Sequence, residues 1–420
     1  MANWRNWSGS VVASPARIAS PRSEAELAGL VAGARRVRVA GTGHSFMPLC
    51  ETDDLLISLS AMPGGLEIAK NRQTVWVPAG WPIGALTAAL WEQSLSLSNQ
   101  GDIDKQAIAG ALATGTHGTG AGLSSLSTFA SGFRLILADG SAVECDRGRD
   151  SELFEAQRLS LGMLGVMTRV KLDVVPAFRL RETIRRAPLL EILDEWDELA
   201  GRHRHVEFFV FPYADEALLK ILDPVESGDD PAPNEPAAIF EGACELARLA
   251  PFLAPGLQRL MTRAIGTSSR SAPAWRIFPS ERSTRFEEME YEIPAPQGPS
   301  ALKAAIELVR ARRYPIVFPL EFRTVAADDI WLSPMNGRAC VSVSFHQYAK
   351  MAWAEPFAAV ERVFRDAGGR PHWAKRHTLG SDDVVALYPQ AQRWGEVRRR
   401  VDPGAKLLNA HLSGLFAFSL

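Results

Sequence analysis

The feature that most constrains the fold of this chain is a two-glycine turn, which follows a β-rich run within residues 37–46. Glycines let bare backbone N–H groups approach a phosphate closely, and this turn also presents one imidazole, that of His44. The turn lacks the third glycine of the dinucleotide fingerprint and the Gly-Lys-Ser/Thr of the P-loop. It therefore indicates a nucleotide-binding fold other than those two.

A second segment, residues 108–120, again combines glycines and threonines with one histidine, His117. Either segment alone is a weak motif, for which an ordinary structural turn is an equally good explanation. Two such loops in one chain could enclose one large anionic cofactor.

Composition sets the broad class. The chain has 420 residues, 46% hydrophobic and 22% charged, which is enough for two cores and predicts two domains. Because 46 basic and 48 acidic residues nearly cancel, the overall charge gives no support for a nucleic-acid partner or a polybasic membrane anchor. No apolar run reaches the about 18 residues of a membrane span, and no signal-peptide pattern opens the sequence. The four cysteines are widely spaced, so we expect a reducing, cytoplasmic location without zinc or disulfides.

Hydrophobic periodicity predicts an α+β protein. In the first part we expect helices at 24–35 and 83–93, strands at 36–40, 55–59 and 74–80, and a hairpin over 132–145 with an Asp-Gly turn. Glycines in 159–165 are expected to break a helix ahead of another strand. After Pro176 we expect strands at 206–211, 315–323 and 340–346 in a mixed sheet backed by helices at 300–312 and 355–366, and an exposed Pro-rich loop at 229–236.

Six motifs occur in order along the chain: Gly41-Thr42-Gly43-His44-Ser45, Asn99-Gln100-Gly101-Asp102, Ala113-Thr114-Gly115-Thr116-His117-Gly118-Thr119-Gly120, Glu321-x-Arg323, His346-Gln347-Tyr348 and Pro371-His372-Trp373-Ala374-Lys375. Together they resemble the aldonolactone oxidoreductases, which have the vanillyl-alcohol-oxidase-type flavoprotein fold. The resemblance covers nearly the full length. It implies a two-domain α+β fold with a PCMH-type FAD-binding domain at 1–175, a cap or substrate domain built on a mixed sheet at 176–390, and a C-terminal segment at 391–420 that returns to the FAD domain.

The same resemblance implies the cofactor, FAD, and a covalent bond from His44 to the 8α carbon of the flavin. The residues that it assigns to FAD binding are Ala40, Gly41, Thr42, Gly43, His44, Ser45, Gly101, Asp102, Gly110, Thr114, Gly115, Thr116, His117, Gly118, Gly165, Val166, His372 and Asn409. Gly101 matches the family's oxygen gatekeeper, where a glycine should leave room for dioxygen. We expect no metal site, because the alternating His203 and His205 have no third ligand nearby.

Four residues are candidates for catalysis: Glu321, Arg323, Lys375 and His346. Glu321 and Arg323 lie two apart on a predicted strand, so they share one face. An ion pair on a solvated face is the alternative, but apolar flanks and the family match favour a substrate clamp. The match also implies that Lys375 stabilises charge at the flavin N1/C2 region or the substrate oxygen. His346 fits a proton acceptor and a buried structural histidine equally well.

The resemblance implies oxidation of C2 of an aldono-1,4-lactone, such as L-gulono-1,4-lactone, with electrons passed through FAD to dioxygen, an acceptor protein or a dye. The first alternative is an alditol oxidase that acts on C1 of xylitol or sorbitol and releases hydrogen peroxide. In the matching motif alditol oxidases have glycine where this chain has Ala374. The second alternative is a non-catalytic flavin- or sugar-binding module. Such a module would be expected to have lost Glu321, Arg323 or Lys375, and this chain retains all three.

Overall fold

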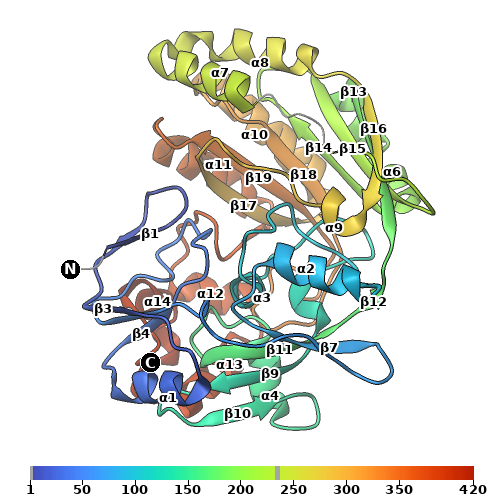
Figure 1. Cartoon of the computed structure of the whole chain (residues 1–420). Coiled ribbons are helices and arrows are strands. Elements are labelled where there is room, and N and C mark those ends of the chain that lie inside the picture. Colours follow the sequence, from blue (N-terminus) through green and yellow to red (C-terminus); the bar gives the residue numbers. More distant parts are fainter. Residues whose placement is uncertain (1–2, 232–236) are drawn as a thin grey trace.

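The structure, a computed structural model, describes residues 3–231 and 237–420 in two stacked units, with both chain ends in the lower unit of Figure 1. The upper unit is built on one eight-stranded sheet, and the lower unit on several smaller sheets. Within the described ranges, no helix is both long and apolar enough to cross a membrane.

The lower unit contains two principal sheets. One is parallel, with the order β3 (Arg17–Ala19), β5 (Leu55–Ile57), β4 (Val37–Val39). The other is antiparallel, with the order β10 (Ala142–Cys145), β9 (Ala130–Ile136), β11 (Val166–Asp173), β7 (Thr74–Pro78), β6 (Glu67–Ile68). Short antiparallel pairs join β1 (Trp4–Arg5) to β2 (Val12–Ala13) and β8 (Leu95–Ser96) to β12 (Val175–Pro176). The helices of this unit are α1 (Glu24–Gly33), α2 (Ile83–Glu92), α3 (Ile108–Thr114) and α4 (Ser151–Gln157).

Most local predictions for this unit are confirmed within a few residues. The hairpin of β9 and β10 closes through Asp139 and Gly140, and Gly140 has the positive φ of 87° that favours glycine there. The chain between α4 and β11 is not helical, because Leu161, Gly162 and Gly165 all have positive φ.

The upper sheet has the order β16 (Ser268–Pro273), β13 (Arg179–Pro188), β15 (Glu216–Val225), β14 (His205–Val210), β18 (Leu320–Val325), β19 (Cys340–Tyr348), β17 (Phe286–Pro294), β20 (Arg370–Pro371). Every pairing in it is antiparallel, so the predicted mixed sheet was wrong. Helix α10 (Gly298–Arg312) does connect two parallel strands, β17 and β18, but β19 lies between them. Periodicity shows which face of a strand is buried and does not show its direction or its neighbours.

The strand predicted at 315–323 begins only at Leu320. Pro315 and Pro319 have no backbone N–H to give to a ladder, which explains why the preceding residues stay outside the sheet. Of the Pro-rich loop predicted at 229–236, residues 229–231 are exposed and the rest lies outside the described residues.

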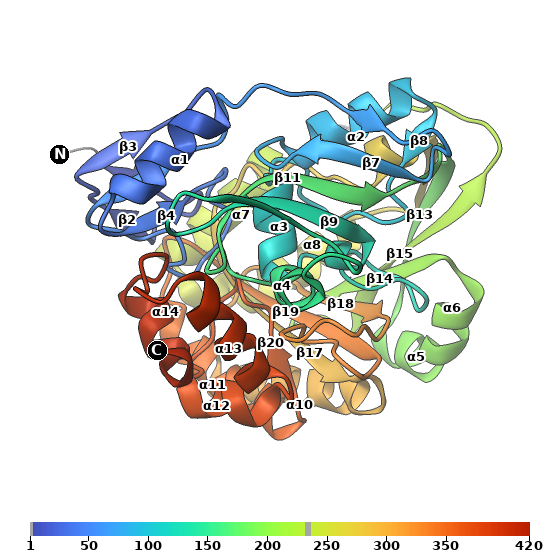
Figure 2. The same ribbon diagram turned by 90° about the horizontal axis from the view of Figure 1, so that it is seen from below.

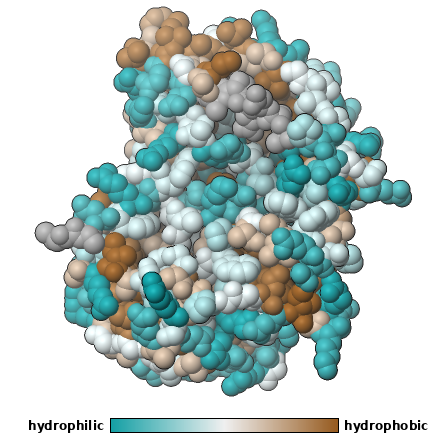
Figure 3. Space-filling view, in the orientation of Figure 1, coloured by the Kyte–Doolittle hydropathy of each residue, from teal (hydrophilic) through white to brown (hydrophobic). Residues whose placement is uncertain are grey.

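The two faces of the upper sheet differ in character. One face packs Phe208, Phe322 and Val343 against α10 and α11 (Ala354–Asp366), and α5 (Leu189–Asp194) and α6 (Trp196–Arg202) lie near the β13 end. Since side chains alternate along a strand, the intervening residues point to the opposite face, toward the lower unit. A helical pair, α7 (Ala237–Leu249) and α8 (Ala254–Ala264), joined by η2 (Pro251–Leu253), lies at the top of Figure 1, where Figure 3 shows a brown hydrophobic surface.

The C-terminal helices complete the core of the lower unit. They are α12 (Ser381–Leu387), α13 (Ala391–Val401) and α14 (Ala410–Leu415), and Figure 2 shows α13 beside α4. Trp373, Trp394 and Phe416 lie in one buried cluster with Leu112 and Phe133. The chain thus contributes to the lower core at residues 330–332 and again from Trp373, ahead of residue 391, while the domain bounds at 175 and 390 stay a prediction.

Candidate active site

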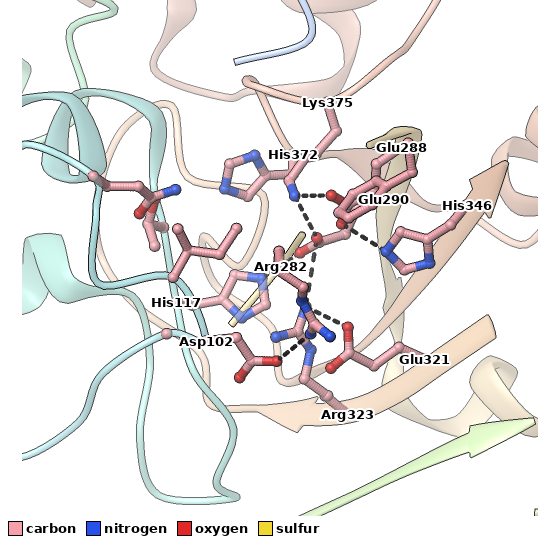
Figure 4. Close-up of a pocket in the computed structure, with 15 residues that line it drawn as sticks. Asp102, His117, Arg282, Glu288, Glu290, Glu321, Arg323, His346, His372 and Lys375 are labelled. Atoms are coloured by element: carbon pink, nitrogen blue, oxygen red, sulfur yellow. Dashed lines mark hydrogen bonds and ion pairs between the residues drawn. The ribbon is translucent and has the colours of Figure 1, made fainter. Parts of the chain in front are cut away.

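A polar pocket lies between the two units (Figure 4). Its walls come from six separate parts of the chain: Gly101, Asp102, Ile103, Gln106, Thr116, His117, Arg282, Phe286, Glu288, Glu290, Glu321, Arg323, His346, His372 and Lys375. All four predicted catalytic residues are among them, together with five of the predicted FAD-binding residues.

The charged face of the upper sheet forms the wall on one side. Arg323 Nη2 lies 3.4 Å from Glu321 Oε2 and 3.5 Å from Glu290 Oε2, and the arginine is only 6% exposed. The alternative of a solvated surface ion pair is therefore excluded for Glu321 and Arg323. On the next strand Glu207 lies directly opposite Arg323 and accepts from Lys220 at 2.8 Å, so the charges alternate across the sheet.

Strand β17 adds a row of carboxylates that the sequence analysis missed. Glu288, Glu290 and Glu292 occupy every second position, and all three are at least 96% buried. Met289 and Tyr291, between them, point into the apolar core on the other side of the sheet. The signal was present in the sequence, because three carboxylates with a period of two, alternating with Met289, Tyr291 and Ile293, indicate a polar inner face.

Lys375 connects this row to the first glycine turn. Its ammonium group pairs with Glu288 and lies 3.7 Å from Glu290 Oε2. It also lies 5.4 Å from the ring centre of Phe46. Phe46 directly follows the two-glycine turn, and its N–H donates to the carbonyl oxygen of Ala374 at 2.7 Å. The His-Trp-Ala-Lys segment and the first glycine turn are thus in direct contact.

His346 also lies beside the carboxylate row. Its Nδ1 donates to the carbonyl oxygen of Pro319 at 3.2 Å, and its Nε2 lies 3.3 Å from Glu288 Oε1. Because a carbonyl oxygen can only accept, Nε2 is the ring atom able to exchange a proton with Glu288 or with a ligand.

The pocket carboxylates differ in their electrostatic surroundings. Burial, reinforced by Asp102 and Glu207, raises the pKa of Glu321 well above its usual range even though Arg323 opposes the shift. For Glu290, burial would also raise the pKa, but Arg323, Lys375 and His117 outweigh it and lower the pKa well below normal. The surroundings therefore favour the protonated form at Glu321 and the ionised form at Glu290.

His117 is a buried cation. Its Nδ1 faces the carbonyl oxygen of Gly118 at 2.8 Å, and its Nε2 faces Glu290 Oε1 at 2.7 Å and Glu292 Oε1 at 3.2 Å. Both ring nitrogens must donate, so the imidazole carries two protons. Burial alone would lower the pKa of His117, but Glu292 and Glu290 outweigh burial and raise the pKa to about 10.

We expect the stabilisation from His117 to depend on pH. A pKa of about 10 in the folded protein against 6.5 in the unfolded chain gives full stabilisation below pH 6.5, which is lost as the pH rises toward 10. The free energy of unfolding of His117→Gln and of the parent, measured in urea across this range, should therefore differ most at the acidic end. A difference that stays constant with pH would contradict the assignment of charge.

The first glycine turn fits the pyrophosphate of FAD. Among the described residues, none accepts a hydrogen bond from the backbone N–H groups of residues 41–45, which leaves them open to an anion. A Cβ on Gly41 would lie 2.9 Å from the Cβ of Ala107, and Gly43 has a φ of 76°. In the second loop a Cβ on Gly118 would lie 2.3 Å from the carbonyl oxygen of Gln100. Both loops thus require glycine where they approach other backbone.

His44 lies at the edge of this arrangement, stacked on Trp7 with 5.8 Å between the ring centres. Burial, and then the positive charge of Lys375, lower the pKa of His44 to about 4. At neutral pH the ring is uncharged and has a free electron pair on one nitrogen, as a bond to a flavin carbon requires.

The other predicted FAD-binding residues fall into two groups. Gly101, Asp102, Thr116 and His372 line the pocket, and a Cβ on Gly101 would come within 3.0 Å of the carbonyl oxygen of His117. Gly101→Ala would therefore displace backbone as well as fill space, and it is no clean test of oxygen access. The remaining residues do not line the pocket: Ala40, Gly110, Thr114, Gly115, Gly165, Val166 and Asn409.

Asn409 has a structural role in the fold. Its Oδ1 accepts from the N–H of Leu412 and so caps α14, while its Nδ2 donates to the carbonyl oxygens of Pro48 and Glu51. These contacts tie the C-terminal helices to the loop that follows the first glycine turn.

Comparisons with known proteins agree with this geometry. The sequence profile described as D-arabinono-1,4-lactone oxidase matches residues 170–415, and the profile described as FAD binding domain matches residues 15–146. L-gulono-1,4-lactone dehydrogenase of Mycobacterium tuberculosis is 40% identical over 97% of both chains. An alditol oxidase of Streptomyces is 29% identical over 98% of both chains.

The fold has also been seen in crystals. The cholesterol oxidase of Brevibacterium sterolicum superimposes on 99% of this chain and 96% of its own, with a TM-score of 0.82 and 16% identity. At this identity the likeness concerns the fold alone, and it agrees with the predicted α+β fold class. The profile and the 40% identity carry the assignment further: the chain belongs to the aldonolactone oxidoreductase family of FAD-dependent enzymes.

Proposed function

We propose that this enzyme oxidises C2 of an aldono-1,4-lactone of the L-gulono-1,4-lactone type. The observation that carries the proposal is the buried constellation of Glu321, Arg323 and Lys375 at a pocket rich in hydrogen-bonding groups. A polyhydroxylated lactone offers the hydroxyl and carbonyl oxygens that such a pocket can pair. The extended identity to a dehydrogenase named for this lactone supports the substrate class.

Each side chain has a chemical part in the proposal. The guanidinium of Arg323, held by Glu321 and Glu290, contacts the oxygen at which negative charge develops as the C2–H bond breaks. The pair formed by His346 and Glu288, whose Nε2 and Oε1 lie 3.3 Å apart, accepts the hydroxyl proton. FAD, when bound, accepts the hydride. Because burial favours the protonated form of Glu321, we propose that its carboxyl group donates a hydrogen bond to a substrate oxygen, a refinement of the acceptor role expected from the sequence.

We further propose that FAD is bound covalently through His44 and that dioxygen, an acceptor protein or a dye takes the electrons. The neutral His44 ring supports the first proposal, as do the hydrogen bonds of the adjacent Ser45 and Phe46 to Ala374, next to Lys375. Cys50, Cys145, Cys244 and Cys340 are free thiols, and the cytoplasmic location that their spacing predicts stays a proposal.

Oxidation of an alditol at C1 is the second candidate, favoured by the match to an alditol oxidase along 98% of the chain. Anaerobic mixing of the yellow enzyme with a panel of aldonolactones and alditols, followed by flavin absorbance, separates the two. We expect bleaching by L-gulono-1,4-lactone at low concentration and little by xylitol or sorbitol. Preferential bleaching by the alditols would replace the lactone proposal, and bleaching by neither would contradict both.

A further inference from the structure

The loop between β1 and β2 holds the backbone on both sides of His44. The N–H of Trp7 donates to the carbonyl oxygen of Gly43 at 2.8 Å. On the other side, Nδ2 of Asn6 donates to the carbonyl oxygen of Ser45 at 3.0 Å. These two hydrogen bonds end on the residues that directly precede and follow His44. The loop therefore fixes the position from which the His44 ring extends.

Asn6 is itself held firmly by the same loop. Its Oδ1 accepts from the N–H groups of Gly9 and Val11, at 3.0 Å each, and its Nδ2 also donates to Ser8 Oγ at 3.0 Å. The residue is only 5% exposed. An amide side chain has two N–H donors and one acceptor oxygen, and here all of them are engaged. Asn6 is thus a rigid link between the loop and the first glycine turn.

The ring of His44 is oriented by stacking and not by hydrogen bonds. Within the ranges that the structure describes, neither of its ring nitrogens has a hydrogen-bond partner. The ring lies on the indole of Trp7, with an angle of 30° between the two planes. The indole in turn packs in a T-shaped arrangement against Phe286, a pocket residue, with 5.1 Å between the ring centres. Trp7 therefore sets the tilt of the imidazole and leaves both nitrogens free to react.

The bond proposed for His44 requires such an orientation. A nucleophilic nitrogen must aim its electron pair at the carbon that it attacks. The new N–C bond replaces the N–H bond of the imidazole and one C–H bond of the 8α methyl group. The two hydrogens pass to the flavin as two protons and two electrons, and dioxygen takes them up as hydrogen peroxide. A ring that rotated freely would rarely present its nitrogen along the required line.

We propose that Trp7 is a positioning residue for the covalent attachment of FAD, a role that rests on the bond proposed for His44. It presents an imidazole nitrogen to the 8α carbon, while Asn6 keeps the turn in place. Because a displacement of about 1 Å can slow a reaction between bound groups about 100-fold, the rate of attachment should depend steeply on the stack. Binding of FAD should depend on it little, because the open N–H groups of the glycine turn remain.

The test times the attachment in the full-length protein. Apoprotein from riboflavin-starved cells is mixed with FAD in air, and acid precipitation at intervals separates pelleted from free flavin. Trp7→Leu is expected to bind FAD like the parent but to attach it more slowly, by a factor of about ten or more. Trp7→Phe keeps an aromatic face and should stay within about threefold of the parent. Trp91→Leu is the matched control and should attach FAD at the parent's rate, because Trp91 is a half-buried tryptophan of the same unit that packs against Arg179.

Quenching of FAD fluorescence and the thermal midpoint of unfolding distinguish positioning from a general structural role. In Trp7→Leu both should resemble those of Trp91→Leu, whereas a structural role would change them together with the attachment rate and overturn the proposal. Attachment by Trp7→Leu at the parent's rate, or equal slowing in Trp7→Leu and Trp7→Phe, would also overturn it. A parent whose flavin never enters the pellet would contradict the bond to His44 as well, which separates the two failures.

Discussion

Arg323→Met is expected to slow anaerobic flavin reduction by the lactone by a factor on the order of 10²–10³. The guanidinium stabilises charge that develops only as the hydride leaves, so the limiting rate should fall more than substrate affinity. Stopped-flow measurement of flavin bleaching against lactone concentration gives both quantities. A limiting rate equal to that of the parent would show that Arg323 does not face the reacting oxygen.

The same substitution should also destabilise the protein. Arg323 is the common partner of Glu321 and Glu290 and lies opposite Glu207, so its loss removes a buried cation from this cluster and leaves Glu321 without its ion-pair partner. The free energy of unfolding is expected to fall by an amount on the order of 3–5 kcal/mol. Arg323→Lys keeps the positive charge but lacks the planar guanidinium group. Compared with Arg323→Met, it should recover most of the stability but only part of the reduction rate. Equal recovery of both would indicate that charge alone matters.

His44→Ala is expected to release all of the flavin into the supernatant after acid precipitation, whereas the parent pellet stays yellow. The reason is that only a covalent bond survives loss of the fold. His203 serves as the control, because its imidazole pairs with Asp223 in the upper unit. The variant His203→Gln should give a yellow pellet like that of the parent. A colourless parent pellet would reject the covalent bond.

A second readout of His44→Ala does not depend on turnover. Alkylation at the 8α carbon withdraws electron density from the flavin, so its loss should lower the reduction potential. Equilibration with a reference dye measures this potential in parent and variant. An unchanged potential, together with flavin release, would limit the role of His44 to retention of the cofactor.

The sequence predicted local geometry well where short segments carry it themselves. The glycine turn before His44 and the pair Glu321 and Arg323 depend on local spacing, and both lie where that spacing places them. The antiparallel course of the upper sheet depends on which strands become neighbours. That choice is made by contacts between residues far apart in the chain, such as Glu207 opposite Arg323.

The carboxylate row of β17 illustrates a second limit. Glu288, Glu290 and Glu292 can be read from the sequence as one face of a strand, but not as the partners of Lys375, Arg323 and His117. Each partner arrives from another part of the chain. For Asn409 the family motif indicated the cofactor, while the structure shows its amide occupied by backbone groups.

The discontinuous core of the lower unit has a consequence for synthesis. Residues 179–371 hold every strand of the upper sheet and leave the ribosome before Trp394 and Phe416, which the lower core needs. The upper unit can therefore fold first, while the earlier-made glycine loops wait with exposed apolar surface. Chaperone dependence should concentrate in this interval, and a stop codon shortly before the C-terminal helices should spare the sheet but abolish flavin retention.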